Sequence, residues 1–298
     1  EYMINGYRQG RTPNPDVMCN KEIKFGLFLK KALEMGADYV ATGHYVRLEF
    51  RSQNLEFSKK NKKSLNPKSY ILYSARDKNK DQSYFLWTLT QEQLKHCLFP
   101  IGDYLKSEVR QMARKAGLPT AEKKDSQGIC FLGKVALDEF LGKYIPEKRG
   151  EIRDASGEKI GEHKGAHFYT IGQRHIGVKY QVSGIKGNTK PYYVAEKNVK
   201  TNTLIVAEGS ANPALYKREI ELADVNFINP NCPIAQLPNF PVLARVRYRQ
   251  PLAEATLKLI NSSNVQLKFD APVKFVAPGQ SAVFYSAAGE LLGGGVIL

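Results

Sequence analysis

The stretch Arg11-Thr12-Pro13-Asn14-Pro15-Asp16-Val17-Met18-Cys19-Asn20-Lys21-Glu22-Ile23 sets the interpretation of the first half of the chain. Each of its two prolines fixes its own φ and moves the preceding residue away from helical geometry, which predicts a stiff, extended turn. We expect Asn20 to cap a helix that runs over residues 21–35 and stops at Gly36. Apolar residues at helical spacing predict the buried face of this helix: Ile23, Leu27, Phe28, Ala32 and Leu33.

A cysteine and a carboxylate lie close together in this stretch. Cys19 falls directly before the expected helix, where the backbone N–H groups and the helix dipole favour a thiolate. Asp16 comes three residues earlier on the same stiff turn, close enough to handle a proton near the sulfur. The pattern indicates a reactive centre. The alternative interpretation is that the prolines only shape a loop and that Cys19 is a small, buried apolar residue.

The next segment has the pattern of an α/β domain. Residues 38–42 predict a short buried strand, and Gly43 and His44 follow directly. Ligands of α/β sheets bind at the carboxyl ends of the strands, so we expect Gly43 to let a flat ligand approach and His44 to face the same crevice. An ordinary turn is the alternative. A further strand at 70–75 and three helices complete a domain over residues 1–149, with the helices starting near Thr90, Ser107 and Leu137.

The composition limits the class of protein and of partner. Lys and Arg number 44 against 29 Asp and Glu, which gives a net charge of +15 and a pI near 9.5. This excess predicts a polyanionic partner, and nucleic acid is favoured over membrane because no amphipathic anchor is evident. The four cysteines form no C-x-x-C pair, which argues against a zinc site and a secreted disulfide scaffold and favours a reducing, cytoplasmic location. We also expect a segment to be missing before Glu1, since no initiator methionine or signal peptide leads the chain.

Two loops of the first domain combine polar residues with groups that suit RNA or sulfur chemistry. The segment 78–87 mixes charged and amide side chains with aromatic ones, as a nucleic-acid contact would. The segment 123–133 carries Cys130 between glycines, which indicates a mobile loop that could move this thiol. A loop cysteine that packs into the core is the alternative.

From about Gly150 the chain changes to short alternating strands with turn residues. Residues 150–207 predict a small β-rich domain, and residues 208–298 predict a compact antiparallel barrel. A strand over 242–250 would place three arginines on one face, as a row of phosphate-binding guanidinium groups: Arg245, Arg247 and Arg249.

Five motifs occur in order along the chain: Asn14-Pro15-Asp16-x-x-Cys19-Asn20-Lys21, Ala41-Thr42-Gly43-His44-Tyr45, Lys80-Asp81-Gln82-Ser83-Tyr84-Phe85-Leu86, Asp125-Ser126-Gln127-Gly128-Ile129-Cys130-Phe131 and Gly172-Gln173-Arg174. Together they resemble the tRNA-specific 2-thiouridylase family, over essentially the whole chain. The resemblance implies an α/β plus all-β protein: a partial adenine-nucleotide α-hydrolase-like (ATP-pyrophosphatase) domain, a small β-rich central domain and a C-terminal antiparallel β-barrel. It also implies an enzyme that uses ATP to adenylate the 2-oxygen of the wobble uridine (U34) of tRNA and replaces it with persulfide sulfur.

The resemblance implies roles for single residues. Cys130 would hold the persulfide, Cys19 would release its sulfur and leave a Cys19–Cys130 disulfide, and Asp16 would be the acid/base. Asn14, Pro15 and Asp16 would meet the target base, and Gly43 would contact ATP, with Mg²⁺ beside it. The expected contacts to the anticodon region of tRNA are His44, Lys80, Asp81, Gln82, Arg247, Tyr248 and Gln280. A sulfur-carrier protein downstream of a cysteine desulfurase would supply the sulfur, and we expect a monomer.

One family feature has no counterpart in this sequence. The phosphate-cradling Ser-Gly-Gly-x-Asp-Ser loop of the family lies upstream of Asn14-Pro15-Asp16, and the chain contains no such stretch. We expect a fragment that is inactive without that loop. The alternatives are a non-catalytic tRNA-binding module, another ATP-pyrophosphatase RNA enzyme such as a 4-thiouridine synthase or a lysidine synthetase, and an argininosuccinate-synthase-like enzyme. The two cysteines argue against lysidine chemistry, and the basic barrel argues against a small-molecule enzyme.

Overall fold

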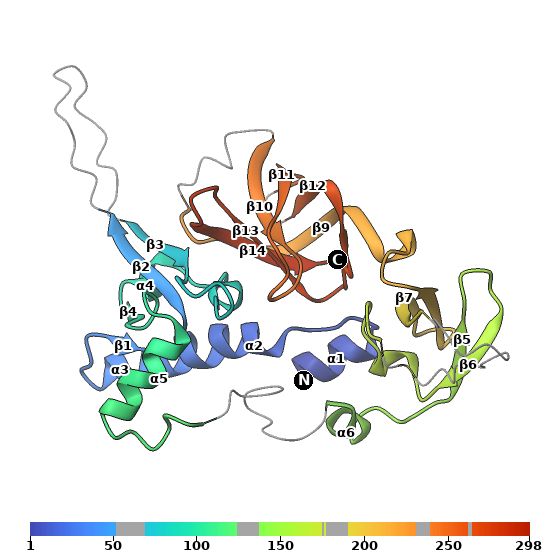
Figure 1. Ribbon diagram of the computed structural model, residues 1–298, viewed down its shortest axis with the longest axis horizontal. Helices are drawn as coiled ribbons and strands as arrows, with labels where there is room; N and C mark the ends of the chain where they lie inside the picture. Colours follow the sequence, from blue (N-terminus) through green and yellow to red (C-terminus); the bar gives the residue numbers. More distant parts are fainter. Residues whose placement is uncertain (52–68, 124–136, 175, 177–189, 231–238, 262–263) are drawn as a thin grey trace.

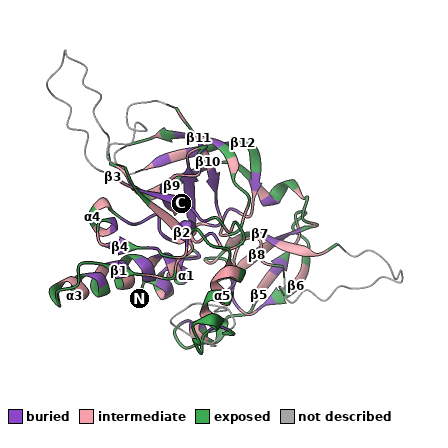
Figure 2. Cartoon of the chain, turned by 60° about the vertical axis from the view of Figure 1, so that its left-hand side comes forward, coloured by how far each residue is buried: buried purple, intermediate pink, exposed green. Residues whose placement is uncertain are grey.

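The computed structural model describes residues 1–51, 69–123, 137–174, 176, 190–230, 239–261 and 264–298. Figure 1 shows a closed barrel above a long helical segment that starts at α2, with a four-stranded sheet at the far end of the molecule from α3. The buried residues, purple in Figure 2, gather in the barrel strands and on the inner faces of the other elements. Within the described residues, no helix is long and apolar enough to span a membrane.

The first region combines helices with two small sheets. β1 pairs with β4 in parallel and β2 pairs with β3 antiparallel. A capping box at Thr90 starts α4, as the sequence predicted, because the Thr90 hydroxyl and the Gln93 side chain satisfy each other's backbone N–H groups. The elements are α1 (Tyr2–Arg8), α2 (Pro15–Met18), η1 (Cys19–Phe28), α3 (Leu29–Glu34), β1 (Val40–Ala41), β2 (Val46–Arg51), β3 (Ser69–Ser74), η2 (Ser83–Phe85), α4 (Gln91–Leu94), β4 (Cys97–Leu98) and α5 (Lys106–Lys115).

The buried face of the first long helix differs from the prediction. Leu27 is 70% exposed and Ile23 and Phe28 are exposed as well, whereas Phe25 and Leu29 are buried. The residues of η1 form a π-helix, whose hydrogen bonds span five residues and which has more residues per turn than an α-helix. A stripe derived from a period of 3.6 residues therefore marks the wrong side chains here.

The central region is a four-stranded sheet of strand order β6-β5-β8-β7, in which β5 and β8 are parallel. Its core includes Leu141 of α6 and also Met3 and Tyr7 of α1. Helices from the start of the chain and from residues 137–142 thus pack on the central sheet. The elements are α6 (Leu137–Gly142), β5 (Gly150–Arg153), β6 (Lys159–His163), η3 (Ala166–Phe168), β7 (Tyr192–Asn198) and β8 (Thr203–Glu208).

The C-terminal region is a closed antiparallel barrel of strand order β10-β11-β12-β9-β14-β13, which confirms the predicted fold class. It packs closely on the first region through Gly294, where an added Cβ would lie 2.7 Å from the ring of Trp87. The exact domain boundaries remain predictions. The elements are η4 (Pro213–Leu215), β9 (Tyr216–Phe227), β10 (Phe240–Arg245), β11 (Ala253–Leu259), β12 (Val265–Lys274), β13 (Ser281–Tyr285) and β14 (Leu291–Ile297).

Candidate active site

The turn at residues 12–14 leads directly into α2. Asn14 is buried, and its side-chain oxygen accepts the backbone N–H of Val17 at 3.3 Å. Pro15 occupies the first helical position, where its missing N–H has no helical partner to lose. An asparagine cap followed by proline is a strong start signal, so the helix begins at Pro15. The predicted start after an Asn20 cap was wrong.

The earlier start moves Cys19 into the second turn of a continuous helix. The effect of the dipole and of the unpaired N–H groups is confined to the first turn, so the argument for a thiolate at a helix N-terminus was wrong. Asp16 lies in that first turn, three residues before Cys19, and residues three apart share one helix face. Asp16 and Cys19 therefore lie on the same side of the helix, with Cys19 only 7% exposed.

Asn20 ties this helix to the segment 80–86. Its side-chain NH₂ donates to the carbonyl of Phe85 at 3.1 Å, and the side chain is buried. Its oxygen has no hydrogen-bond partner among the described residues. The sequence interpretation missed this contact because it used Asn20 as a cap. Nothing in the local pattern marks Phe85 as the partner, since 65 residues separate the two.

Gly43 and His44 follow β1 at the carboxyl edge that β1 shares with its parallel neighbour β4. Gly43 is exposed, and a Cβ added there would meet no atom within 4 Å. The His44 ring packs 5.8 Å from the ring of Phe25, which belongs to the same helix as Cys19. Burial, with the charge of Lys24, lowers the pKa of His44 to about 4. His44 is therefore neutral at pH 7, and the edge beside the helix is open at Gly43.

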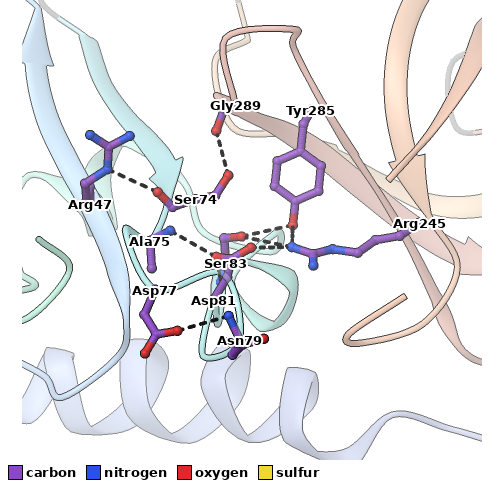
Figure 3. Close-up of polar contacts among 10 residues, drawn as sticks. All are labelled: Arg47, Ser74, Ala75, Asp77, Asn79, Asp81, Ser83, Arg245, Tyr285 and Gly289. Atoms are coloured by element: carbon purple, nitrogen blue, oxygen red, sulfur yellow. Dashed lines mark hydrogen bonds and ion pairs between the residues drawn. The ribbon is translucent and has the colours of Figure 1, made fainter. Parts of the chain in front are cut away.

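Asp81 belongs to a buried cluster between the segment 80–86 and the barrel (Figure 3). One carboxylate oxygen accepts the N–H groups of Ala75 and Ser83, both at 3.2 Å, and the other pairs with Arg245 at 2.5 Å. Arg245 also donates to the hydroxyl of Tyr285 at 2.7 Å. Because its oxygens are engaged in this cluster, Asp81 ties the segment to the barrel, and the tRNA contact expected for it stays a prediction.

Lys80 and Gln82 lie on either side of Asp81 and do different things. The half-buried Lys80 lines a cavity of about 580 Å³ between the first region and the barrel, together with Lys106 and Arg249. Gln82 instead binds the backbone of Tyr45. Its side-chain oxygen accepts the Tyr45 N–H at 3.0 Å, and its backbone N–H donates to the Tyr45 carbonyl at 2.9 Å. Gln82 thereby fixes the loop next to His44.

The predicted row of three arginines on one strand face was wrong. β10 ends at Arg245, which is buried against Asp81. Arg247 and Arg249 lie in the turn that follows, and Arg249 has a φ of 65°, in the left-handed region. The alternation of side chains on which the prediction relied therefore stops at Arg245.

Arg247 and Tyr248 face different neighbours within this turn. The Arg247 guanidinium donates to the carbonyl of Ile171 in the central region and lies 5.6 Å from the centre of the Phe275 ring. Tyr248 packs against Phe85, with ring centres 4.5 Å apart. The structure thus brings Tyr248 beside the segment that Asn20 anchors, while Arg247 joins the barrel to the central sheet.

Gln280 precedes β13 and reaches the turn before the helix that carries Asp16 and Cys19, which is called the reactive helix below. Its side-chain NH₂ donates to the carbonyl of Thr12 at 2.9 Å and to that of Pro13 at 3.3 Å. The sequence resemblance predicts a tRNA contact for Gln280, and the structure shows what its amide group holds in the protein. No local signal could have paired residues that lie 268 positions apart.

Two further sequence predictions concern cysteines and metals. Cys130 lies outside the described residues, so the expected pairing with Cys19 stays a prediction. Cys97 is buried, its thiol donates to the Gln93 carbonyl at 3.0 Å, and burial raises its pKa to about 12, all of which fits a structural residue. The described residues contain no cluster of three or more His, Cys, Asp and Glu side chains that could hold a metal ion.

Three family models match successive parts of the chain. Residues 1–134 match the tRNA methyl transferase HUP domain, and residues 138–208 match the tRNA methyl transferase PRC-barrel domain. Residues 217–297 match the aminomethyltransferase beta-barrel domain. These matches agree with the three regions of the fold: an α/β region, a β-rich central region and a C-terminal barrel.

Curated relatives match over nearly the whole chain. It is 45% identical over 296 residues to the tRNA-specific 2-thiouridylase MnmA 2 of Geobacillus kaustophilus, which covers 99% of this chain and 73% of the relative. It is 46% identical over 300 residues to the MnmA protein of Buchnera aphidicola subsp. Schizaphis graminum, which covers 100% and 76%. The MnmA protein of Idiomarina loihiensis is 43% identical over 301 residues, which covers 100% and 75%.

Proposed function

Because the chain belongs to the tRNA-specific 2-thiouridylase family, we propose that it transfers persulfide sulfur to C2 of the wobble uridine (U34) of tRNA in an ATP-dependent reaction. One structural observation carries the proposal beyond the family relationship. Asp16 and Cys19 share one face of a helix whose start is fixed by Asn14, next to the open sheet edge at Gly43. A proton acceptor and a thiol therefore lie on one helix, and Phe25 of that helix packs against His44, beside the exposed Gly43 at the sheet edge.

ATP would supply the adenylyl group that turns the 2-oxygen of uridine into a leaving group. Gly43 fits contact with the nucleotide, because it is exposed at the carboxyl edge of the parallel strands and has open space where a side chain would stand. Mg²⁺ would arrive with the nucleotide phosphates, since such ions are held by few protein ligands.

The sulfur step is a thiol–persulfide exchange. We assign the persulfide to Cys130, loaded by a sulfur-carrier protein downstream of a cysteine desulfurase. Asp16 accepts the proton of the Cys19 thiol, and the thiolate attacks the inner sulfur of the Cys130 persulfide. A Cys19–Cys130 disulfide forms and hydrosulfide leaves. The hydrosulfide then attacks C2 and displaces the adenylated oxygen, which departs as AMP. A dithiol reductant must supply two electrons to restore both thiols.

The tRNA contacts predicted from the sequence divide into two groups in this proposal. Lys80, Tyr248 and the neutral His44 present groups that suit a phosphate, a base face and a hydrogen bond. Four others have side chains that bind groups of distant segments, and they would act by holding the first three in place: Asp81, Gln82, Arg247 and Gln280. The net charge of +15 suits the polyanion as a whole.

The target base would meet the half-buried Pro15 and Asp16 at the helix start, where the buried Asn14 acts as the cap. A base in an anticodon loop must leave its stack to reach such a site. We further propose that the enzyme is a monomer and works in the cytoplasm with its tRNA.

The test is a thiolation assay on the full-length protein with ATP, a persulfide donor and unmodified tRNA, read on a mercury-containing gel that retards thiolated tRNA. Wild-type protein should retard the tRNA, and Cys19→Ser should abolish the shift while tRNA affinity stays unchanged. Wild-type protein that binds tRNA and never thiolates it would leave a non-catalytic tRNA-binding module as the function.

A further inference from the structure

The turn before the reactive helix is held by the barrel. The backbone N–H of Thr12 donates to the carbonyl of Pro278 at 2.7 Å, and the Gln280 side chain donates to the carbonyls of Thr12 and Pro13. Gly279 makes this approach possible, since a Cβ there would lie 2.9 Å from the Thr12 nitrogen. Both backbone groups of Thr12 are thus bound to the loop before β13.

The central region holds the same turn from another side. Lys197, on β7, donates its ammonium to the carbonyl of Tyr169 at 2.7 Å and to the Thr12 hydroxyl at 3.4 Å. The Thr12 hydroxyl in turn donates to that of Thr170 at 3.4 Å. Burial lowers the pKa of Lys197 to about 8. Burying a charged lysine lowers the free energy of unfolding, so a purely stabilising role explains Lys197 poorly.

The turn has little freedom to absorb a displacement. Pro13 packs against Gly6 of α1, where an added Cβ would lie 2.3 Å from its ring. Pro13 and Pro15 each have a fixed φ, and only two residues separate Thr12 from the helix that begins at Pro15 and carries Asp16. A shift at Thr12 is therefore passed to the helix start.

We propose that Lys197 and Gln280 are positioning residues, which hold Thr12 and Pro13 from the central domain and the barrel and so set the placement of Asp16 and Cys19. This inference rests on the proposed function for its kinetic readout, and the thiol readout below is independent of that function. It explains why a tRNA enzyme would need both β domains seated before sulfur transfer, since a displacement of about 1 Å at reacting groups is enough to slow a reaction greatly.

Matched variants test the two contacts. Lys197→Met removes the donor and Lys197→Arg keeps one; Gln280→Glu keeps the shape and loses the NH₂ donor. Lys197→Met and Gln280→Glu should each lower the single-turnover thiolation rate about tenfold, because each removes the two hydrogen bonds that the side chain donates at the turn. Lys197→Arg should recover much of the rate. Two charge controls away from the turn should leave the rate unchanged: Lys159→Met and Gln266→Glu.

Three readouts separate positioning from general stability and from RNA binding. The free energy of unfolding of Lys197→Met should equal or exceed that of wild type, and its tRNA dissociation constant should match that of Lys159→Met. The double variant Lys197→Met/Gln280→Glu should lose less thiolation rate than the product of the two single losses, because both contacts hold the same turn. Full activity in both single variants, or a loss that tracks unfolding or tRNA affinity, would overturn the inference.

The rate at which Cys19 is alkylated in the native protein, measured by peptide mapping, tests the positioning role even if no tRNA is thiolated. Both variants should raise this rate by loosening the helix start, and the two control variants should not. If wild-type protein fails to thiolate tRNA, the proposed function fails, whereas an unchanged Cys19 alkylation rate refutes the positioning role by itself.

Discussion

Replacing Arg245 with methionine removes the cation from the buried pair with Asp81. Asp81 is 4% exposed and Arg245 is 7% exposed, so little solvent screens the charge that remains. Breaking a buried ion pair costs about 3–5 kcal/mol. Two backbone N–H groups, those of Ala75 and Ser83, still bind the Asp81 carboxylate. We therefore expect the low end, a loss of about 3 kcal/mol in the free energy of unfolding.

Urea unfolding followed by tryptophan fluorescence measures this loss, because Trp87 is buried where the segment 80–86 meets the barrel. The double variant Asp81→Asn/Arg245→Met carries no unpaired charge and should regain most of the stability. Arg249→Met, at an exposed arginine of the next turn, serves as the control. A change within about 0.5 kcal/mol for Arg245→Met, the range of an ordinary surface substitution, would refute the reasoning.

Three more predictions concern the sheet edge and the RNA contacts. Gly43→Ala should leave the free energy of unfolding unchanged, since its Cβ meets open space, and should weaken ATP binding in calorimetry; equal ATP affinity would remove Gly43 from the nucleotide site. The folded-state pKa of His44 is about 4 and its ordinary value is 6.5, so between these values only the unfolded chain takes up the proton, and stability falls as the pH falls from 6.5 to 4. His44→Gln should flatten that dependence in unfolding experiments, and an identical slope would contradict the burial of a neutral ring. Lys80→Ala should lower the slope of log tRNA-binding constant against log salt concentration by about 1, the share of one phosphate contact. An unchanged slope would place the Lys80 ammonium away from the RNA.

The sequence could predict those elements whose signals are local. The Thr90 capping box, the strand near Tyr70 and the barrel strands depend on neighbouring residues, and the structure contains them. The start of the reactive helix was also encoded locally, in Asn14 and Pro15, and was missed because Asn20 offered a second cap.

Contacts between distant segments could not be predicted in this way. Asp81 and Arg245 are 164 residues apart, and no periodicity links them. The same holds for Gln280 and for Lys197, which reach Thr12 from two other domains. The arginine row failed for a different reason, because β10 ends at Arg245 and the chain turns over the residues that carry Arg247 and Arg249.

The central claim is that Cys130 carries the sulfur and that Cys19 releases it, and a peptide map of these thiols tests it most directly. The full-length protein is incubated with a persulfide donor, ATP and unmodified tRNA, alkylated without reductant, and digested. The account predicts an extra sulfur on Cys130 before turnover and a Cys19–Cys130 disulfide after it, at a yield that matches the 2-thiouridine formed. Thiolated tRNA beside two unmodified thiols would contradict it.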